Sequence, residues 1–127
     1  MSPKKILIVE DNGVQLLAIT EALVHAGYSV LQAATGHEGF QMAMSHEPAL
    51  IVVDKLMPGL TGIEMMKKIR EKKWGATVPV IFFSNSPAAD DKEAIDMIKP
   101  LAYFVKSDAS LKDIIEKIKT TLQEKPA

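Results

Sequence analysis

The chain has 127 residues, a length typical of one domain, and its 47% hydrophobic and 24% charged residues match an ordinary globular protein. Its 15 basic and 16 acidic residues give a net charge of −1, which argues against a generic binder of nucleic acid or acidic membrane. The sequence contains no cysteine, so disulfides, thiolate metal sites and thiol nucleophiles are excluded.

The N-terminal residues show no targeting pattern. The basic stretch 1–5 is followed only by the apolar run Ile6–Val9 before the acidic Glu10 and Asp11. A signal peptide needs an apolar stretch of roughly 7–15 residues, and a membrane span needs about 20. We therefore expect a cytoplasmic protein with no membrane association.

Short apolar runs along the chain predict five strands. Four of the runs are continuous and rich in β-branched or aromatic residues, as is typical of strands buried on both faces. The second run mixes in polar residues and better fits an edge strand. In chain order the runs are Ile6–Val9, Tyr28–Ala33, Leu50–Val53, Val80–Phe83 and Tyr103–Val105.

Apolar residues at helical spacing predict a helix after each strand. The last helix is the clearest, because 111–122 carries one apolar stripe and Ser110 can cap its start. The first helix should end at Gly27, the second before Pro48 and the fourth near Pro100. The first four helices are marked by Leu16, Ile19 and Leu23; Phe40, Ala43 and Met44; Ile63, Met66 and Ile69; and Ala94, Ile95 and Ile98.

Strand and helix thus alternate five times, in repeats of the size of a βαβ unit. Right-handed crossovers then require a parallel sheet with helices on both faces. The sequence predicts one α/β domain over 1–127, a flavodoxin-like doubly wound (βα)5 fold with strand order 2-1-3-4-5.

Polar residues follow four of the predicted strands. Glu10 and Asp11 come after the first, Asp54 after the third, Ser84 after the fourth and Lys106 after the fifth. In such a sheet the ligand site lies beyond the carboxyl ends of the strands. Three carboxylates that converge repel one another unless a cation binds or a pKa rises. Their hard oxygen atoms favour Mg²⁺.

This arrangement indicates phosphoryl chemistry. Lys106 can pair with a phosphoryl oxygen, and the Ser84 hydroxyl can donate a hydrogen bond to another. Asp54, at the end of the central strand, is then the candidate nucleophile, since an aspartate can form an aspartyl phosphate.

Over almost its whole length the chain resembles the receiver domain of bacterial two-component response regulators, in particular the single-domain, chemotaxis-regulator type. An acidic pair, an aspartate, a hydroxyl and a lysine each occupy a different strand end in the order that this family shows. The matching segments are Ile8–Asn12, Val53–Gly62, Phe83–Ser84 and Tyr103–Lys106.

The resemblance implies a signalling module rather than an enzyme with a separate substrate. Its phosphodonor would be a sensor histidine kinase or a phosphotransfer protein. For a free-standing protein, output would pass through protein contacts on the face of the fourth helix, fifth strand and fifth helix, since nothing after Lys125 could form a DNA-binding domain. The same sequence also fits a receiver excised from a larger regulator or hybrid kinase. The implied site residues are the phosphoacceptor Asp54; the Mg²⁺ ligands Glu10, Asp11, Asp54 and the backbone carbonyl of Leu56; the phosphoryl-binding residues Ser84 and Lys106; and the switch residues Ser84 and Tyr103.

The sequence departs from the family at several positions. Ser107 follows Lys106 where the family has a proline after a cis bond, and a non-proline cis bond costs about 3 kcal/mol, so a trans peptide here would change the reach of Lys106. Asn85 replaces a small residue beside the phosphoryl site, and 99–100 is Lys-Pro in place of a common Gly-Ala. Lys55 places a charge directly after the candidate phosphoacceptor.

Two other functions compete with phosphoacceptance. Asn85 and Ser107 favour a phosphorylation-independent scaffold that keeps the receiver fold, whereas the complete set of acidic, hydroxyl and lysine positions argues against it. A flavodoxin-like or nucleotide-binding enzyme would bind phosphate in the loop after the first strand. That loop is Glu10-Asp11-Asn12, which repels phosphate unless a metal intervenes and has no glycine-rich fingerprint, so we reject this enzyme function.

Overall fold

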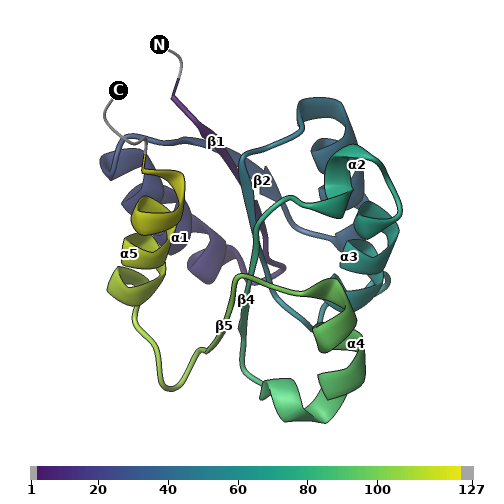
Figure 1. Cartoon of the computed structure of the whole chain (residues 1–127). Helices are drawn as coiled ribbons and strands as arrows, with labels where there is room; N and C mark the ends of the chain where they lie inside the picture. The colour runs from purple at the N-terminus through teal and green to yellow at the C-terminus, as the bar shows by residue number, and fades with distance from the viewer. Residues whose placement is uncertain (1–2, 124–127) are drawn as a thin grey trace.

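A computed structural model describes residues 3–123. A five-stranded parallel sheet in the order β2-β1-β3-β4-β5 lies between two layers of helices (Figure 1). The elements are β1 (Lys5–Val9), α1 (Gly13–His25), β2 (Ser29–Ala33), α2 (Gly36–His46), β3 (Leu50–Val53), α3 (Gly62–Arg70), the 3-10 helix η1 (Trp74–Ala76), β4 (Val80–Ser84), the 3-10 helix η2 (Ala88–Asp91), α4 (Lys92–Ile98), β5 (Ala102–Val105) and α5 (Leu111–Leu122). The predicted flavodoxin-like fold and strand order are confirmed.

The continuous apolar runs of the strands are explained by helices on both faces of the sheet. Helices α1 and α5 cover one face, and α2, α3 and α4 cover the other (Figure 1). Side chains alternate between the two faces, so that Leu50 and Val52 of β3 pack with the α1 and α5 side while Ile51 and Val53 pack with the opposite side. Both faces of the central strands are therefore buried core.

Helix starts follow the capping residues in the sequence. The side chain of Asn12 accepts a hydrogen bond from the backbone N–H of Gln15 at the start of α1. Ser110 caps α5 as predicted, and it forms a reciprocal capping box with Asp113. Because only residues 10–12 lie between β1 and α1, this capping also restrains the backbone that carries the acidic pair.

The expectation that the fifth strand is buried on both faces is wrong. All of β5 is only half-buried, because it is an edge strand that pairs with β4 alone. The prediction for the second strand is confirmed, since β2 is the other edge. Within residues 3–123, no helix combines the length and the apolar character needed to cross a membrane.

Candidate functional site

The predicted acidic cluster forms at the carboxyl edge of the sheet. Strands β1 and β3 are neighbours, with Val9 paired to Val53, so the residues that follow them lie side by side. Glu10, Asp11 and Asp54 each offer a carboxylate oxygen within 4.8 Å of the others. Glu10 and Asp54 are buried, at 2% and 8% exposure, whereas Asp11 is exposed.

Lys106 supplies a positive charge to this cluster. Its Nζ lies 2.6 Å from Glu10 Oε1 and 3.0 Å from Asp54 Oδ2, and it also lies 5.6 Å from the centre of the Phe83 ring. The backbone N–H of Lys106 donates to the carbonyl of Ser84, which ties the ends of β5 and β4 together. No cis peptide occurs among the described residues, so Lys106 reaches both carboxylates with a trans bond to the next residue.

The electrostatics of Glu10 and Lys106 follow from their shared burial. Burial raises the pKa of Glu10, and the hydrogen bond from Lys106 offsets only part of that rise. Burial by itself lowers the pKa of Lys106, but its hydrogen bonds to Glu10 and Asp54 outweigh burial and raise the pKa above its usual value. The ammonium therefore stays charged between the two carboxylates.

The loop after β3 holds Asp54 in place. The backbone N–H of Leu56 donates to Asp54 Oδ1 over 3.2 Å, and the N–H of Gly62 donates to the carbonyl of Lys55 over 2.9 Å. A Cβ at Gly62 would lie 2.0 Å from the Asp54 carbonyl oxygen, so only glycine allows α3 to start this close to the loop. The aspartate is thus oriented by Lys106 on one oxygen and the loop backbone on the other.

The donor set suits a hard divalent cation. The cluster offers carboxylate oxygens only, and Asp11 opens it to solvent. Mg²⁺ is held in proteins through a few carboxylates and keeps several waters, which matches a half-open group of acids. The residues present therefore fit Mg²⁺, as the sequence predicted.

Ser84 and Tyr103 lie beside this cluster rather than in it. Ser84 is buried at the end of β4, and within residues 3–123 its hydroxyl makes no hydrogen bond to the three acids but lies 3.4 Å from the backbone nitrogen of Ser86. The Tyr103 hydroxyl donates to the carbonyl of Ser86, and its ring stacks on Phe82 with centroids 5.6 Å apart. Both side chains therefore contact the loop that follows β4.

Lys55 is the polar residue whose placement the sequence did not predict. Its side chain is 1% exposed, and its Nζ lies 2.9 Å from Asp91 Oδ2 and 3.0 Å from the carbonyl oxygen of Pro87. Burial by itself lowers the pKa of Lys55, but the hydrogen bond to Asp91 and the nearby Tyr103 outweigh burial and raise it. The signal in the sequence is its position two residues after the end of a fully buried strand.

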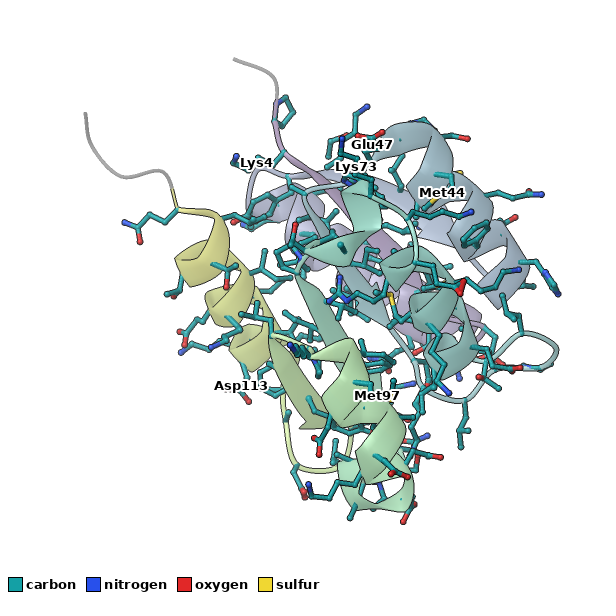
Figure 2. All side chains as sticks on the ribbon, turned by 45° about the vertical axis from the view of Figure 1, so that its right-hand side comes forward. Lys4, Met44, Glu47, Lys73, Met97 and Asp113 are labelled. Carbon is teal, nitrogen blue, oxygen red and sulfur yellow. The ribbon has the colours of Figure 1, made fainter. Side chains whose placement is uncertain are left out.

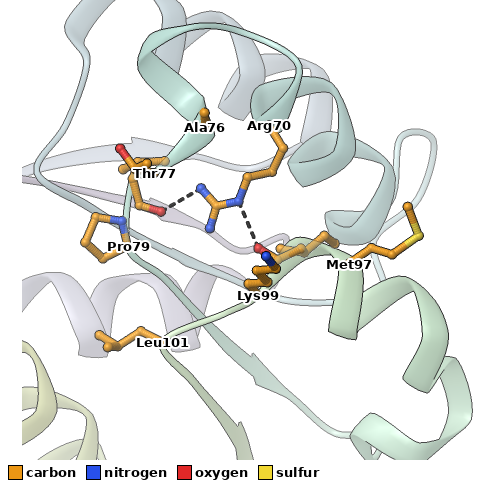
Figure 3. Close-up of a pocket in the computed structure, with 9 residues that line it drawn as sticks. Arg70, Ala76, Thr77, Pro79, Met97, Lys99 and Leu101 are labelled. Atoms are coloured by element: carbon orange, nitrogen blue, oxygen red, sulfur yellow. Dashed lines mark hydrogen bonds between the residues drawn. The ribbon is translucent and has the colours of Figure 1, made fainter.

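A cavity of about 540 Å³ lies away from the acids, at the amino edge of the sheet (Figure 3). It lies between the ends of α3 and α4 and the starts of β4 and β5, and Met97, 75% exposed, lies beside it on α4 (Figure 2). Arg70 spans it, donating from Nε to the Ile98 carbonyl and from Nη1 to the carbonyls of Gly75 and Val78. The guanidinium thus joins α3, η1 and α4.

Replacing this guanidinium should destabilise the fold modestly. In Arg70→Met three hydrogen bonds are lost, but the cavity is open and water can replace part of them, so we expect a loss of about 1 kcal/mol. Urea denaturation measures the change, with the exposed Lys72→Met as the matched control. Equal stability of the two variants would show that Arg70 does not join these elements.

Comparisons with known proteins agree with this geometry. The family model of the response regulator receiver domain matches residues 6–119. The polar-differentiation response regulator DivK of Brucella anthropi is 30% identical over 94% of this chain and 97% of its own length. A CheY-like receiver domain protein from Methanospirillum hungatei is 27% identical with a TM-score of 0.87, covering 95% of this chain and 94% of that one.

A further solved structure carries ligands. The response regulator TrrA from Thermotoga maritima, in complex with Mg²⁺ and beryllofluoride, is 28% identical with a TM-score of 0.82 and covers 94% of this chain and 99% of that one. The family match extends over nearly the whole sheet and includes every strand end that carries a site residue. The chain therefore belongs to the response regulator receiver domains of two-component systems.

Proposed function

We propose that residues 1–127 act as one phosphoacceptor receiver in a two-component phosphorelay. The single observation that carries the proposal is the partly buried cluster at the carboxyl edge, where carboxylate oxygens of Glu10, Asp11 and Asp54 lie within 4.8 Å of one another and Lys106 bonds to two of the acids. Mg²⁺ would be held by these three carboxylates and the backbone carbonyl of Leu56. The complex of the similar protein TrrA with Mg²⁺ and beryllofluoride supports the presence of a Mg²⁺ site.

Asp54 is the proposed nucleophile. One of its carboxylate oxygens forms a bond to phosphorus, while the bond from phosphorus to the imidazole nitrogen of a phosphohistidine breaks and that nitrogen keeps the electron pair. The donor would be a sensor histidine kinase or a phosphotransfer protein. Leu56 N–H and Lys106 Nζ orient the carboxylate, and Lys106 and Ser84 would bind oxygens of the transferred group. When bound, Mg²⁺ would neutralise negative charge on that group.

The conformational change on phosphorylation would be transmitted from Ser84 to Tyr103. A Ser84 hydroxyl drawn toward a phosphoryl oxygen moves the start of the loop that contains Ser86, and Tyr103 is hydrogen-bonded to that residue's carbonyl. Because Tyr103 belongs to β5, the movement reaches the face formed by α4, β5 and α5, which we propose as the contact surface for a downstream protein.

Phosphorylation by a small donor tests the function directly. We expect incubation with acetyl phosphate and Mg²⁺ to add one phosphoryl group, detected by intact mass, and EDTA to prevent it. A folded protein that gains no phosphoryl group from acetyl phosphate or from any sensor kinase of its source organism would instead support the phosphorylation-independent scaffold, which Asn85, exposed beside the site, favours.

The metal site gives a second prediction. Mg²⁺ that binds only the folded state stabilises it by about 1.4 kcal/mol at ten times its dissociation constant, so the thermal midpoint should rise with Mg²⁺ concentration. Asp11→Ala should remove most of this rise, since Asp11 is the exposed carboxylate of the cluster. Asp108→Ala, an exposed aspartate in the loop before α5, is the control. An equal rise in both variants would contradict the ligand assignment.

A further inference from the structure

Lys55 makes a contact that phosphoryl chemistry does not explain. It follows Asp54 directly, yet its ammonium turns away from the acidic cluster, whose positive charge comes from Lys106. The side chain, 1% exposed, instead reaches the segment after β4, where it pairs with Asp91 at 2.9 Å and donates to the carbonyl of Pro87 at 3.0 Å. The buried ammonium of Lys55, which follows β3, thus holds the loop that follows β4.

Two side chains hold neighbouring carbonyls of this loop, residues 85–91, which we call the β4–α4 loop. Lys55, from the end of β3, binds the carbonyl of Pro87, and Tyr103, from β5, binds the carbonyl of Ser86. The hydrogen bonds that the loop makes to itself and to the end of β4 are longer, at 3.3 Å from the Asp90 nitrogen to the Pro87 carbonyl and 3.4 Å from the Ser86 nitrogen to Ser84 Oγ. The loop therefore depends on its neighbours for its position.

The ion pair makes movement of this loop costly. An ammonium buried to 1% exposure that loses its partner is left as an uncompensated charge, which is strongly unfavourable in a protein interior. Asp91 is 42% exposed and ends η2, so a shift of the loop toward the phosphoryl site either carries Asp91 along or breaks the pair. The strength of the Lys55–Asp91 ion pair therefore depends on the position of the loop.

We propose that Lys55 is a positioning residue that holds the β4–α4 loop in its unphosphorylated arrangement and so opposes the movement of Ser84 toward a phosphoryl group. This inference rests on the proposed function of Asp54. Its consequence is that the Lys55–Asp91 pair sets how readily this receiver adopts its phosphorylated conformation, since a ligand and a conformational equilibrium affect each other reciprocally.

Three variants test the proposal. Lys55→Met keeps the apolar stem and removes the charge, and Asp91→Asn removes the charge of the partner and keeps its shape. The double variant shows whether both single substitutions act by breaking the same ion pair. Lys92→Met is the matched control, because Lys92 forms an exposed ion pair with Asp96 one residue beyond the loop. Chemical denaturation establishes that each variant is folded before the two measurements below.

The first measurement needs no phosphorylation. Amide hydrogen exchange of residues 85–91, without Mg²⁺ or phosphodonor, should be about tenfold faster in Lys55→Met and in Asp91→Asn, because the local opening free energy falls. The double variant should exchange no faster than the single ones, and Lys92→Met should match the wild type. Unchanged exchange in Lys55→Met, or additive effects in the double variant, would overturn the proposal.

The second measurement separates positioning from simple structural support. Beryllofluoride with Mg²⁺ should bind Lys55→Met and Asp91→Asn about fivefold more tightly than the wild type, as followed by titration of backbone amide resonances. Weaker or equal binding in folded variants would overturn the proposal and leave the function of Asp54 intact. A wild type that binds no beryllofluoride would contradict both, and the exchange result would still show whether Lys55 holds the loop.

Discussion

Asp54→Asn should abolish Mg²⁺-dependent phosphorylation by acetyl phosphate, with a loss of more than roughly 100-fold in rate. An amide has no carboxylate oxygen to attack phosphorus, so the variant lacks the nucleophile, while its size and its remaining carbonyl oxygen preserve the hydrogen bond from the Leu56 N–H. We therefore expect the fold to survive. Intact mass after a timed incubation measures the rate, and circular dichroism measures the fold.

A matched variant separates this effect from a general loss of negative charge. Asp108→Asn makes the same substitution at an exposed aspartate outside the cluster and should be phosphorylated at the wild-type rate. If Asp54→Asn is phosphorylated as fast as the wild type, and the group maps to another residue, Asp54 is not the acceptor. If Asp108→Asn also loses phosphorylation, the reaction depends on overall charge rather than on the buried carboxylate.

Most of the fold is predictable from the sequence because its strands and helices have different patterns of apolar residues. The run of Leu50–Val53 has no polar residue, since both of its faces are buried, and Leu111–Leu122 keeps its apolar residues on one stripe against α1 and the sheet. The run Tyr103–Val105 misled for a physical reason. Aromatic and β-branched residues favour strands wherever they occur, so the composition of the run does not distinguish an edge strand from a central one. Only the predicted strand order places β5 at the edge of the sheet.

The candidate site is predictable as far as the backbone determines it. Parallel strands bring their carboxyl ends to one edge, so the meeting of Glu10, Asp11 and Asp54 follows from strand order alone. The direction of a long side chain does not follow in this way. A lysine after a buried strand can turn toward the acids or toward the next loop, and Lys55 turns toward the loop because Asp91 lies there.

Arg70 shows the same limit at the other edge of the sheet. Most residues of the lysine-rich stretch 67–73 are exposed, as is typical of a solvated helix end, yet the guanidinium of Arg70 donates to three backbone carbonyls, at the end of α4, in η1 and in the loop before β4. Burial alone lowers the pKa of Arg70, as expected for a cation taken partly out of water. The carbonyls that will accept hydrogen bonds from such a side chain cannot be identified in a sequence until the loops are placed.

Lys106→Met should destabilise the metal-free protein and make its stability depend more strongly on Mg²⁺. Without the ammonium, the carboxylates of Glu10 and Asp54, at 2% and 8% exposure, face each other with no cation between them. Removing one partner costs less here than in a dry interior, because Asp11 opens the cluster to water, so we expect a loss of about 2 kcal/mol, or about 6 °C in thermal midpoint.

A bound divalent cation can replace the missing positive charge. Mg²⁺ should therefore raise the thermal midpoint of Lys106→Met by more than it raises that of the wild type, where Lys106 already bonds to two of the three acids. Melting curves in EDTA and in a Mg²⁺ series measure both midpoints, with Lys119→Met on the exposed side of α5 as the control. If the wild type and Lys106→Met respond equally to Mg²⁺, the lysine and the metal do not share these carboxylates. The expected result would instead show that Lys106 supplies positive charge to these carboxylates before any metal binds, which explains how acids this close together are accommodated in the metal-free protein.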